Sequence, residues 1–366
     1  MTNWTARPDV FPHGLEYVYE QTGWAVQGHN RFWSNKTTYA KENGGDYAFL
    51  LDVGGYALPA EQRFWDDLLL SSRVKWGLAV YEQDWLDQEF DNFPPLTTNA
   101  TLARTWLSQM ATGAARAGLT VQYCMSHCRH VLASAEFPSV TQARASGDYH
   151  PGGDQWHPVG TTSLFAYALG LAPSKDNYWS TTDQPGAKHY KDHPREPRSR
   201  LQAAVITLTK GPVAPSDAVG HSDVALIMRS AAADGTLLQP GAPAARLDSA
   251  LLAAALDAPP AGLPKGELWA APTVLDGRTF IVVFAARMTE GYALTATELG
   301  DAAGARALPS MVAVEANATA TPVTVSDAAP LRVAACDELD FRLYNLAPRE
   351  ANGWALLGEV ASKWVG

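Results

Sequence analysis

Apolar and polar positions alternate along the first 240 residues in two different rhythms. Apolar residues at helical spacing predict helices over 11–22, 59–73, 101–118 and 161–172. Apolar runs that end in polar residues predict buried strands over 23–34, 75–86, 119–127 and 139–149. The stretch 199–217 fits a helix that passes into a further strand and a turn. Strands and helices in this order are typical of parallel β/α units.

Polar and aromatic side chains follow each predicted strand at the point where it ends. They are His29, Asn30 and Arg31, then Glu82, Asp84 and Trp85, then Tyr123, and then Arg144, Asp148 and Tyr149. In a β/α barrel the loops at these strand ends build the active site. A doubly wound open sheet would instead need a glycine-rich phosphate turn near its start, and no segment has that spacing. The pattern therefore predicts a (β/α)8-type barrel.

The composition changes near residue 240. The segment 241–265 is rich in Ala and Pro, which is typical of a linker. From residue 266 onward, short alternating runs separated by turn residues predict a small antiparallel β-sandwich. We therefore expect a catalytic-type partial barrel in 1–240, a linker in 241–265 and a sandwich in 266–366.

Composition and charge exclude several classes of protein. The net charge of −10 disfavours generic nucleic-acid binding, which needs clustered Lys and Arg. No run is long and apolar enough to span a membrane, and no signal peptide is visible at the N-terminus. The expectation is a soluble protein of undetermined compartment and oligomeric state. Four N-x-S/T sequons, at Asn3, Asn35, Asn99 and Asn317, are a weak hint of the secretory pathway.

The segment "QYCMSHCRHVLASAEFPSVTQARASGDYHPG" resembles the raffinose synthase and alkaline α-galactosidase family of melibiase-type glycoside hydrolases. Its "RASGDY" is similar to that family's R-A-S-D-D-F/Y motif. The segments "LQAAVITLTKGPVAPSD" and "VALIMRSAAADGTLLQPGAPA" resemble the family's last barrel strand and the stretch after it. The resemblance is strong at 121–152 and 201–243 and looser elsewhere. It implies a β/α barrel followed by a β-sandwich.

The resemblance also implies two catalytic carboxylates. Asp148 matches the family's acid/base, four residues after Arg144, and Asp84 in "YEQDW" matches its nucleophile. Glu82 stands where the family has a Lys that touches sugar hydroxyls, so the sugar preference of this chain is open. A retaining mechanism needs two such carboxylates, one to attack the anomeric carbon and one to protonate the leaving oxygen. The implied enzyme is a glycosidase or transglycosidase for α-linked sugars, with neither a metal nor an organic cofactor.

Other residues are candidates for binding an oligosaccharide or glycoside, each with a plainer alternative. Flat aromatic rings can stack on sugars, which makes Trp33, Trp85 and Tyr149 candidates, although they also suit a core. His29, Asn30, Arg31 and Tyr123 follow strand ends and could bind hydroxyls or simply pack. Lys175 and Asp176 stand where the seventh strand should end, and their alternative is a surface turn.

Two further alternatives concern the whole chain. The segment 23–34 resembles the third barrel strand of the family, so the chain is expected to be N-terminally truncated. Because missing strands would leave a barrel open, a non-catalytic carbohydrate-binding or degenerate barrel protein is the alternative function. A hydrolase that uses Cys124 or Ser126 as nucleophile is a third possibility, but no G-x-S-x-G elbow is present.

Overall fold

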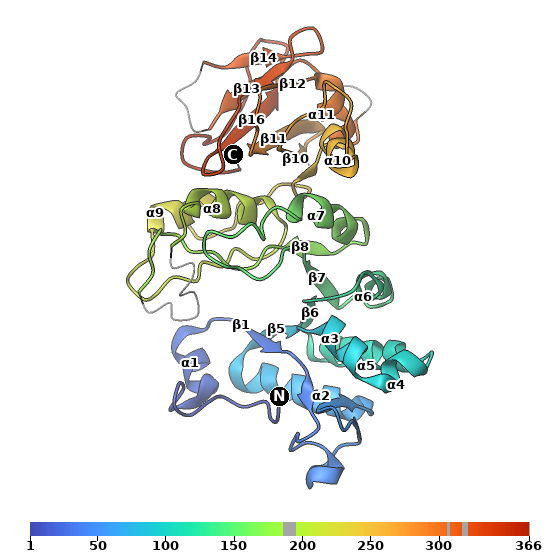
Figure 1. Ribbon diagram of the computed structural model, residues 1–366. Coiled ribbons are helices and arrows are strands. Elements are labelled where there is room, and N and C mark those ends of the chain that lie inside the picture. Colours follow the sequence, from blue (N-terminus) through green and yellow to red (C-terminus); the bar gives the residue numbers. More distant parts are fainter. Residues whose placement is uncertain (186–194, 306–307, 317–320, 366) are drawn as a thin grey trace. The chain divides into compact units, whose positions relative to one another are not determined.

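The computed structural model describes residues 1–185, 195–305, 308–316 and 321–365 (Figure 1). The chain divides into two compact units. Unit 1 comprises Met1–Arg144 with Leu169–Leu171, and unit 2 comprises Ala145–Ala168 and the chain from Ala172 onward. Each unit is described by itself.

Unit 1 is built on parallel strands in the order β1–β5–β6–β7. The strands are β1 (Val26–Asn30), β5 (Leu78–Gln83), β6 (Thr120–Tyr123) and β7 (Val140–Arg144). The helices are α1 (Gly14–Thr22), α2 (Gln62–Trp76), α3 (Leu86–Asn92), α4 (Pro94–Thr98), α5 (Leu102–Ala117) and α6 (Cys128–Ala133). A small antiparallel sheet joins β2 (Trp33–Ser34), β3 (Phe49–Leu51) and β4 (Tyr56–Pro59). All four strands predicted in this region are present, each shorter than expected.

The two faces of the parallel sheet differ in character. Tyr81 and Tyr123 are fully buried on one face, where Tyr81 packs edge-on against Trp65 of α2. Side chains alternate between faces along a strand, so Glu82 lies on the opposite face. In the register of the sheet Glu82 stands beside His29 of β1 and Gln122 of β6. At these positions the second face is therefore polar.

Unit 2 contains helices followed by antiparallel sheets. It begins with α7 (Val159–Ala168), β8 (Ala172–Ser174), α8 (Ser199–Leu208) and α9 (Val224–Ile227). The larger sheet has the order β14–β13–β16–β11–β10–β9. Its strands are β9 (Ala245–Arg246), β10 (Glu267–Leu275), β11 (Arg278–Ala286), β13 (Met311–Glu315), β14 (Val323–Val325) and β16 (Phe341–Pro348). The smaller sheet pairs β12 (Tyr292–Leu294) with β15 (Leu331–Val333), and α10 (Asp248–Ala255) and α11 (Ala296–Ala302) complete the unit. The predicted fold class, parallel α/β structure followed by antiparallel β-structure, is confirmed.

Two segments differ from expectation. The stretch "LQAAVITL", which the family resemblance places on a barrel strand, forms the buried helix α8 instead. The residues after α8 include Pro212 and Pro215, which lack the N–H that a strand needs, and they form an isolated bridge between Tyr178 and Pro215. The expected linker 241–265 contains β9 and α10, whose Ala250 lies in a hydrophobic core. The boundaries at 240 and 265 stay a prediction.

Candidate functional site

Asp84 follows strand β5 directly and is almost fully buried. Its Oδ2 lies 3.0 Å from Nε2 of His29 on β1, and its Oδ1 accepts a hydrogen bond from the Trp85 backbone N–H at 2.8 Å. The Asp84 backbone N–H donates to the Asn30 carbonyl at 2.8 Å, which continues the pairing of β5 with β1 beyond the strand. Adjacent strand ends thus fix both the backbone and the carboxylate of Asp84.

The surroundings of Asp84 favour its ionised form. Burial opposes ionisation, but hydrogen bonds from His29, Cys124 and the Trp85 N–H outweigh it and lower the pKa of the Asp84 carboxyl. The same hydrogen bond to Asp84 raises the pKa of His29, against the opposing effect of partial burial. A carboxylate held in its charged form suits a nucleophile and does not suit a general acid.

The residues that follow β5 and β6 have unusual backbone conformations. Trp85 has φ 54° and Met125 has φ 41°, in the left-handed region that non-glycine residues rarely occupy. The Trp85 ring stacks with Phe32 at 5.8 Å, and the Arg31 guanidinium lies 4.9 Å from the same ring. Strain of this kind clusters at functional sites. The cation–π contact thus brings the predicted residue Arg31 to Trp85, which follows Asp84 in the chain.

Glu82 takes part in a polar row across three strands. The Gln27 amide on β1 donates to Glu82 Oε2 at 2.7 Å and, more weakly, to the Gln122 side-chain oxygen at 3.4 Å. Glu82 therefore presents a hydrogen-bond acceptor to this polar face.

Three predicted binding residues lie in the packing of unit 1. Trp33 is 1% exposed and packs edge-on against Phe64 at 5.2 Å. Asn30 is fully buried and donates to the Tyr81 hydroxyl at 2.8 Å. Tyr123 is also fully buried, and burial raises its pKa. Asn30 is buried while its neighbour His29 is partly exposed, because neighbouring residues on a strand point to opposite faces of the sheet.

Unit 2 carries the second group of predicted residues, on the loop that follows β7. Asp148 is exposed, whereas Tyr149 is buried and held at both ends. The Tyr149 backbone N–H donates to Asp176 Oδ2 at 2.6 Å, and its hydroxyl donates to Glu196 Oε2 at 2.8 Å. The Lys175 ammonium lies 5.0 Å from the centre of the Tyr149 ring. Tyr149, Lys175 and Asp176 are thus brought together, while Arg144 belongs to unit 1.

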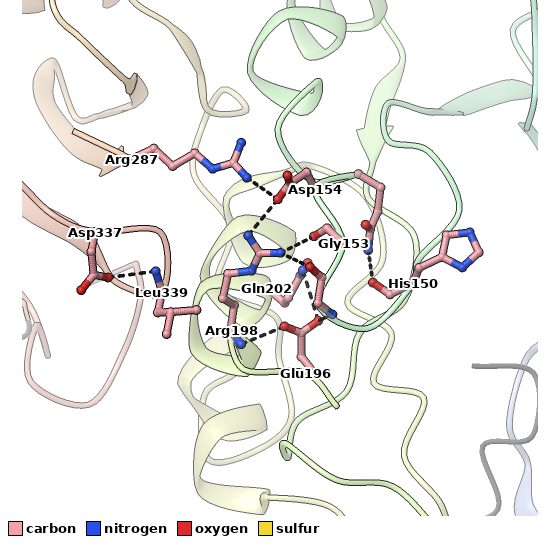
Figure 2. Close-up of polar contacts among 11 residues, drawn as sticks. His150, Gly153, Asp154, Glu196, Arg198, Gln202, Arg287, Asp337 and Leu339 are labelled. Carbon is pink, nitrogen blue, oxygen red and sulfur yellow. Dashed lines mark hydrogen bonds and ion pairs between the residues drawn. The ribbon is translucent and has the colours of Figure 1, made fainter. Parts of the chain in front are cut away.

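Glu196 and Arg198 belong to this group and were not predicted from the sequence. Both are buried, and Arg198 binds the loop at Asp154, as Figure 2 shows. The one sequence signal is the run "REPRS", a Glu and an Arg on either side of a Pro just before the apolar helix α8. Charged residues at such a position usually remain in solvent.

Burial disfavours Cys124 as a nucleophile, while the Ser126 alternative stays a prediction. Burial raises the pKa of the Cys124 thiol, which disfavours the reactive thiolate. His127 Nε2 lies 3.0 Å from Asp91, and the His127 backbone N–H donates to His130 Nδ1 at the start of α6. These histidines serve the start of a helix. Among the described residues, no three His, Cys, Asp or Glu side chains are arranged to hold a metal ion.

A cavity of about 820 Å³ lies within unit 1, between the N-terminal segment, β1 and α2. It reaches Gln27 and His29, but Asp84 is not among its lining residues. Its wall includes several aromatic side chains, among them Trp4 and Trp76. His29 lines this cavity and also contacts the Asp84 carboxylate.

In the described part of the chain, no helix is both long and apolar enough to cross a membrane.

Comparison with known proteins gives only distant structural neighbours. No family model matches the chain, and no curated protein matches it in sequence. Solved structures that resemble it include an alpha-amylase from H. orenii, at 10% identity over 94% of this chain and 86% of that one, with a TM-score of 0.45. Another is an alpha-amylase from Malbranchea cinnamomea, at 10% identity over 90% of this chain and 76% of that one, with a TM-score of 0.41. A third is a GH30 endoxylanase from Clostridium papyrosolvens C71, at 10% identity over 91% of this chain and 92% of that one, with a TM-score of 0.34. These neighbours are glycoside hydrolases. Similarity at this level assigns neither an activity nor a substrate to the chain.

Proposed function

We propose that the chain is a retaining glycosidase that acts on α-linked sugars, with an α-galactoside as the first substrate to test. Asp84 is the nucleophile and Asp148 the acid/base. The observation that carries the proposal is the Asp84 carboxylate, which stands at the end of a parallel strand, is bound by His29 and is held in its ionised form. The resemblance of "RASGDY" to the raffinose synthase family supports the role of Asp148.

The proposed chemistry has two steps. An oxygen of Asp84 attacks the anomeric carbon and forms an ester, while Asp148 gives its proton to the departing glycosidic oxygen. Asp148 then takes a proton from a water molecule, whose oxygen attacks the same carbon and releases Asp84. A sugar hydroxyl in place of that water would give transfer instead of hydrolysis. The ionised form of Asp84 is the form that the first step needs.

A kinetic and labelling experiment tests this proposal. The purified chain is assayed with 2,4-dinitrophenyl α-galactoside, and the adduct from a 2-deoxy-2-fluoro α-galactosyl fluoride is located by mass spectrometry. We expect the label on Asp84, and a loss of about 10³-fold or more in kcat for Asp84→Asn. Asp66→Asn is the control, because Asp66 forms a surface ion pair with Arg116 and a hydrogen bond with Gln62, away from Asp84 in the chain. Label on another residue, or full activity of Asp84→Asn, would overturn the assignment.

The alternative is a carbohydrate-binding protein without catalysis. The Glu82 side chain favours this alternative. It binds the Gln27 amide and stands where the resembled family has a Lys that touches sugar hydroxyls. Calorimetric titration with raffinose separates the two functions. Binding without turnover, unchanged in Asp84→Asn, supports the alternative.

A further inference from the structure

The loop that carries Asp148 is tied to a fully buried carboxylate. Glu196 has no exposed surface and accepts hydrogen bonds from four groups. They are the Tyr149 hydroxyl at 2.8 Å, the Gly152 backbone N–H at 3.1 Å, the Arg198 backbone N–H at 2.8 Å and the Gln202 side-chain amide at 3.4 Å. Two of these donors belong to the loop and two to the start of α8. One carboxylate thus joins two segments that are more than 40 residues apart.

Arg198 makes a second connection to the same loop (Figure 2). Its guanidinium donates to the Gly152 carbonyl, to the Gly153 carbonyl at 2.8 Å and to Asp154 Oδ1 at 2.8 Å. Asp154 also pairs with Arg287, which follows β11. Partial burial opposes ionisation of Asp154, but the hydrogen bonds from Arg287 and Arg198 outweigh it and lower its pKa. Both arginines therefore bind a charged Asp154.

Burying charged groups is a costly way to stabilise a protein. A buried ion pair often contributes no more stability than apolar residues of similar volume would. What charged hydrogen bonds add is geometry, because each donor must meet its acceptor at a set distance and angle. Here the bonds converge on residues 149–154, and Gly152 lies at φ 69°, where a side chain would be strained. The arrangement restricts the loop more than it strengthens the core.

We propose that Glu196 and Arg198 are positioning residues that hold the 148–154 loop and thereby aim the Asp148 carboxyl at the glycosidic oxygen. The proposal rests on the role of Asp148 given above. Proton transfer needs heavy atoms about 2.6–3.2 Å apart. Asp148 is exposed and adjoins Tyr149, whose backbone N–H is bound by Asp176 and whose hydroxyl is bound by Glu196. Glu196 therefore holds the side chain of the residue next to Asp148. Neither Glu196 nor Arg198 is proposed to touch the substrate.

The leaving group provides a readout that a purely structural role would not change. Dinitrophenolate departs without a proton, whereas a sugar alkoxide needs one from the acid. A displaced Asp148 therefore slows the first step, which kcat/KM reports, only for substrates with poor leaving groups. We expect Glu196→Gln to lower kcat/KM by about 10- to 100-fold on raffinose and by less than about threefold on 2,4-dinitrophenyl α-galactoside. Tyr149→Phe removes one donor and keeps the ring. It is also expected to slow raffinose more than the dinitrophenyl substrate, by a smaller factor.

Hydrogen exchange tests the anchoring without any substrate. We expect peptides that cover 148–154 to exchange at least tenfold faster in Glu196→Gln than in the unaltered chain, while peptides from β10 and β11 keep their rates. Arg195→Gln is the matched control, because Arg195 lies in the same segment and forms an exposed ion pair with Asp183. It is expected to change neither exchange nor leaving-group preference.

The possible failures are distinguishable. An unaltered chain that does not cleave the dinitrophenyl glycoside overturns the proposed function, and hydrogen exchange then still tests the anchor. Unchanged exchange in Glu196→Gln and Tyr149→Phe overturns the anchor. A third outcome is faster exchange together with equal losses of kcat/KM on both substrates, in both variants. It would show that Glu196 holds the loop but does not position the Asp148 carboxyl for proton transfer.

Discussion

The imidazole of His29 on β1 lies 3.0 Å from the carboxylate of Asp84, which follows β5. The two residues are 55 positions apart, and the pairing of β1 with β5 brings them together. His29 is about half exposed, whereas the Asp84 side chain is 10% exposed. The hydrogen bond therefore joins a carboxylate inside the fold to a group that solvent can reach and protonate.

This pair predicts the acidic limb of the pH–rate profile. Because the His29 bond helps to lower the pKa of Asp84, His29→Ala should raise that pKa and move the acidic limb of kcat/KM upward by about one pH unit. His29→Gln, which keeps a donor without the charge, should give a smaller shift. The control is His221→Ala, an exposed residue of unit 2. Superimposable acidic limbs in His29→Ala and the unaltered chain would contradict the prediction.

The same pair predicts how stability depends on pH. The raised pKa of His29 means that its contribution is complete below about pH 6.5 and is lost as the pH rises through the folded-state value. The lowered pKa of Asp84 means that its contribution is present above about pH 4 and is lost as the pH falls through its folded-state value. The difference in unfolding free energy between the unaltered chain and His29→Ala should be largest near about pH 5. Urea unfolding at several pH values measures it, and a difference that stays constant up to about pH 9 would be evidence against the pairing.

The backbone at Trp85 predicts an unusual order of stability between two variants. Both Trp85→Ala and Trp85→Gly lose the ring contacts with Phe32 and Arg31, but only glycine relieves φ 54°. We expect Trp85→Gly to be more stable than Trp85→Ala by about 1 kcal/mol, the reverse of the usual order in regular structure. Thermal unfolding of both variants measures the difference, and a more stable alanine variant would show that the strain is absent.

The burial of Trp33 predicts a stability effect in place of a binding effect. Trp33→Ala should lower the free energy of unfolding by about 3–5 kcal/mol, because it leaves a cavity among Tyr39, Phe49 and Phe64. Trp33→Phe should recover much of that loss. Denaturant titration measures both variants. If Trp33→Ala barely changes the free energy of unfolding but weakens sugar binding, Trp33 would instead be a sugar-binding residue.

The separation of the proposed carboxylates is a prediction for a crystal structure with bound substrate analogue. A retaining mechanism requires the carboxyl groups of Asp84 and Asp148 to lie about 5–5.5 Å apart, and about 6.5–9.5 Å would indicate inversion. A larger separation across an occupied sugar site would mean that the two residues do not act as a pair.

The sequence predicted what depends on local pattern. Apolar runs that end in polar residues located β1, β5, β6 and β7, because the periodicity and the end of a strand depend on residues that are close in sequence. The same reasoning grouped His29 with Asn30, although the pleat sends one to the polar face and the other to Tyr81. The pattern also treated 199–217 as a helix followed by a strand, because a short apolar run fits a buried strand or a buried helix equally well.

Long-range partners were beyond the reach of the pattern. Nothing near Glu196 in the sequence shows that Tyr149 and Gly152 will bring donors to it, because these residues lie more than 40 positions away. Trp33 was ambiguous for a related reason. An aromatic residue after a strand can face solvent or a core, and the rings of β3 and α2 that surround it decide which.

The polar row of Gln27, Glu82 and Gln122 also bears on how the chain avoids misfolding. A shift of β5 by one residue would turn Glu82 toward the face that packs on α2 and would bring Tyr81 out. The carboxylate would then be desolvated without the Gln27 amide that binds it in the native pairing. Slipped alignments of these strands are therefore penalised before any substrate is present. Replacing Glu82 with an apolar residue would alter the polar face and also remove this safeguard against mispairing.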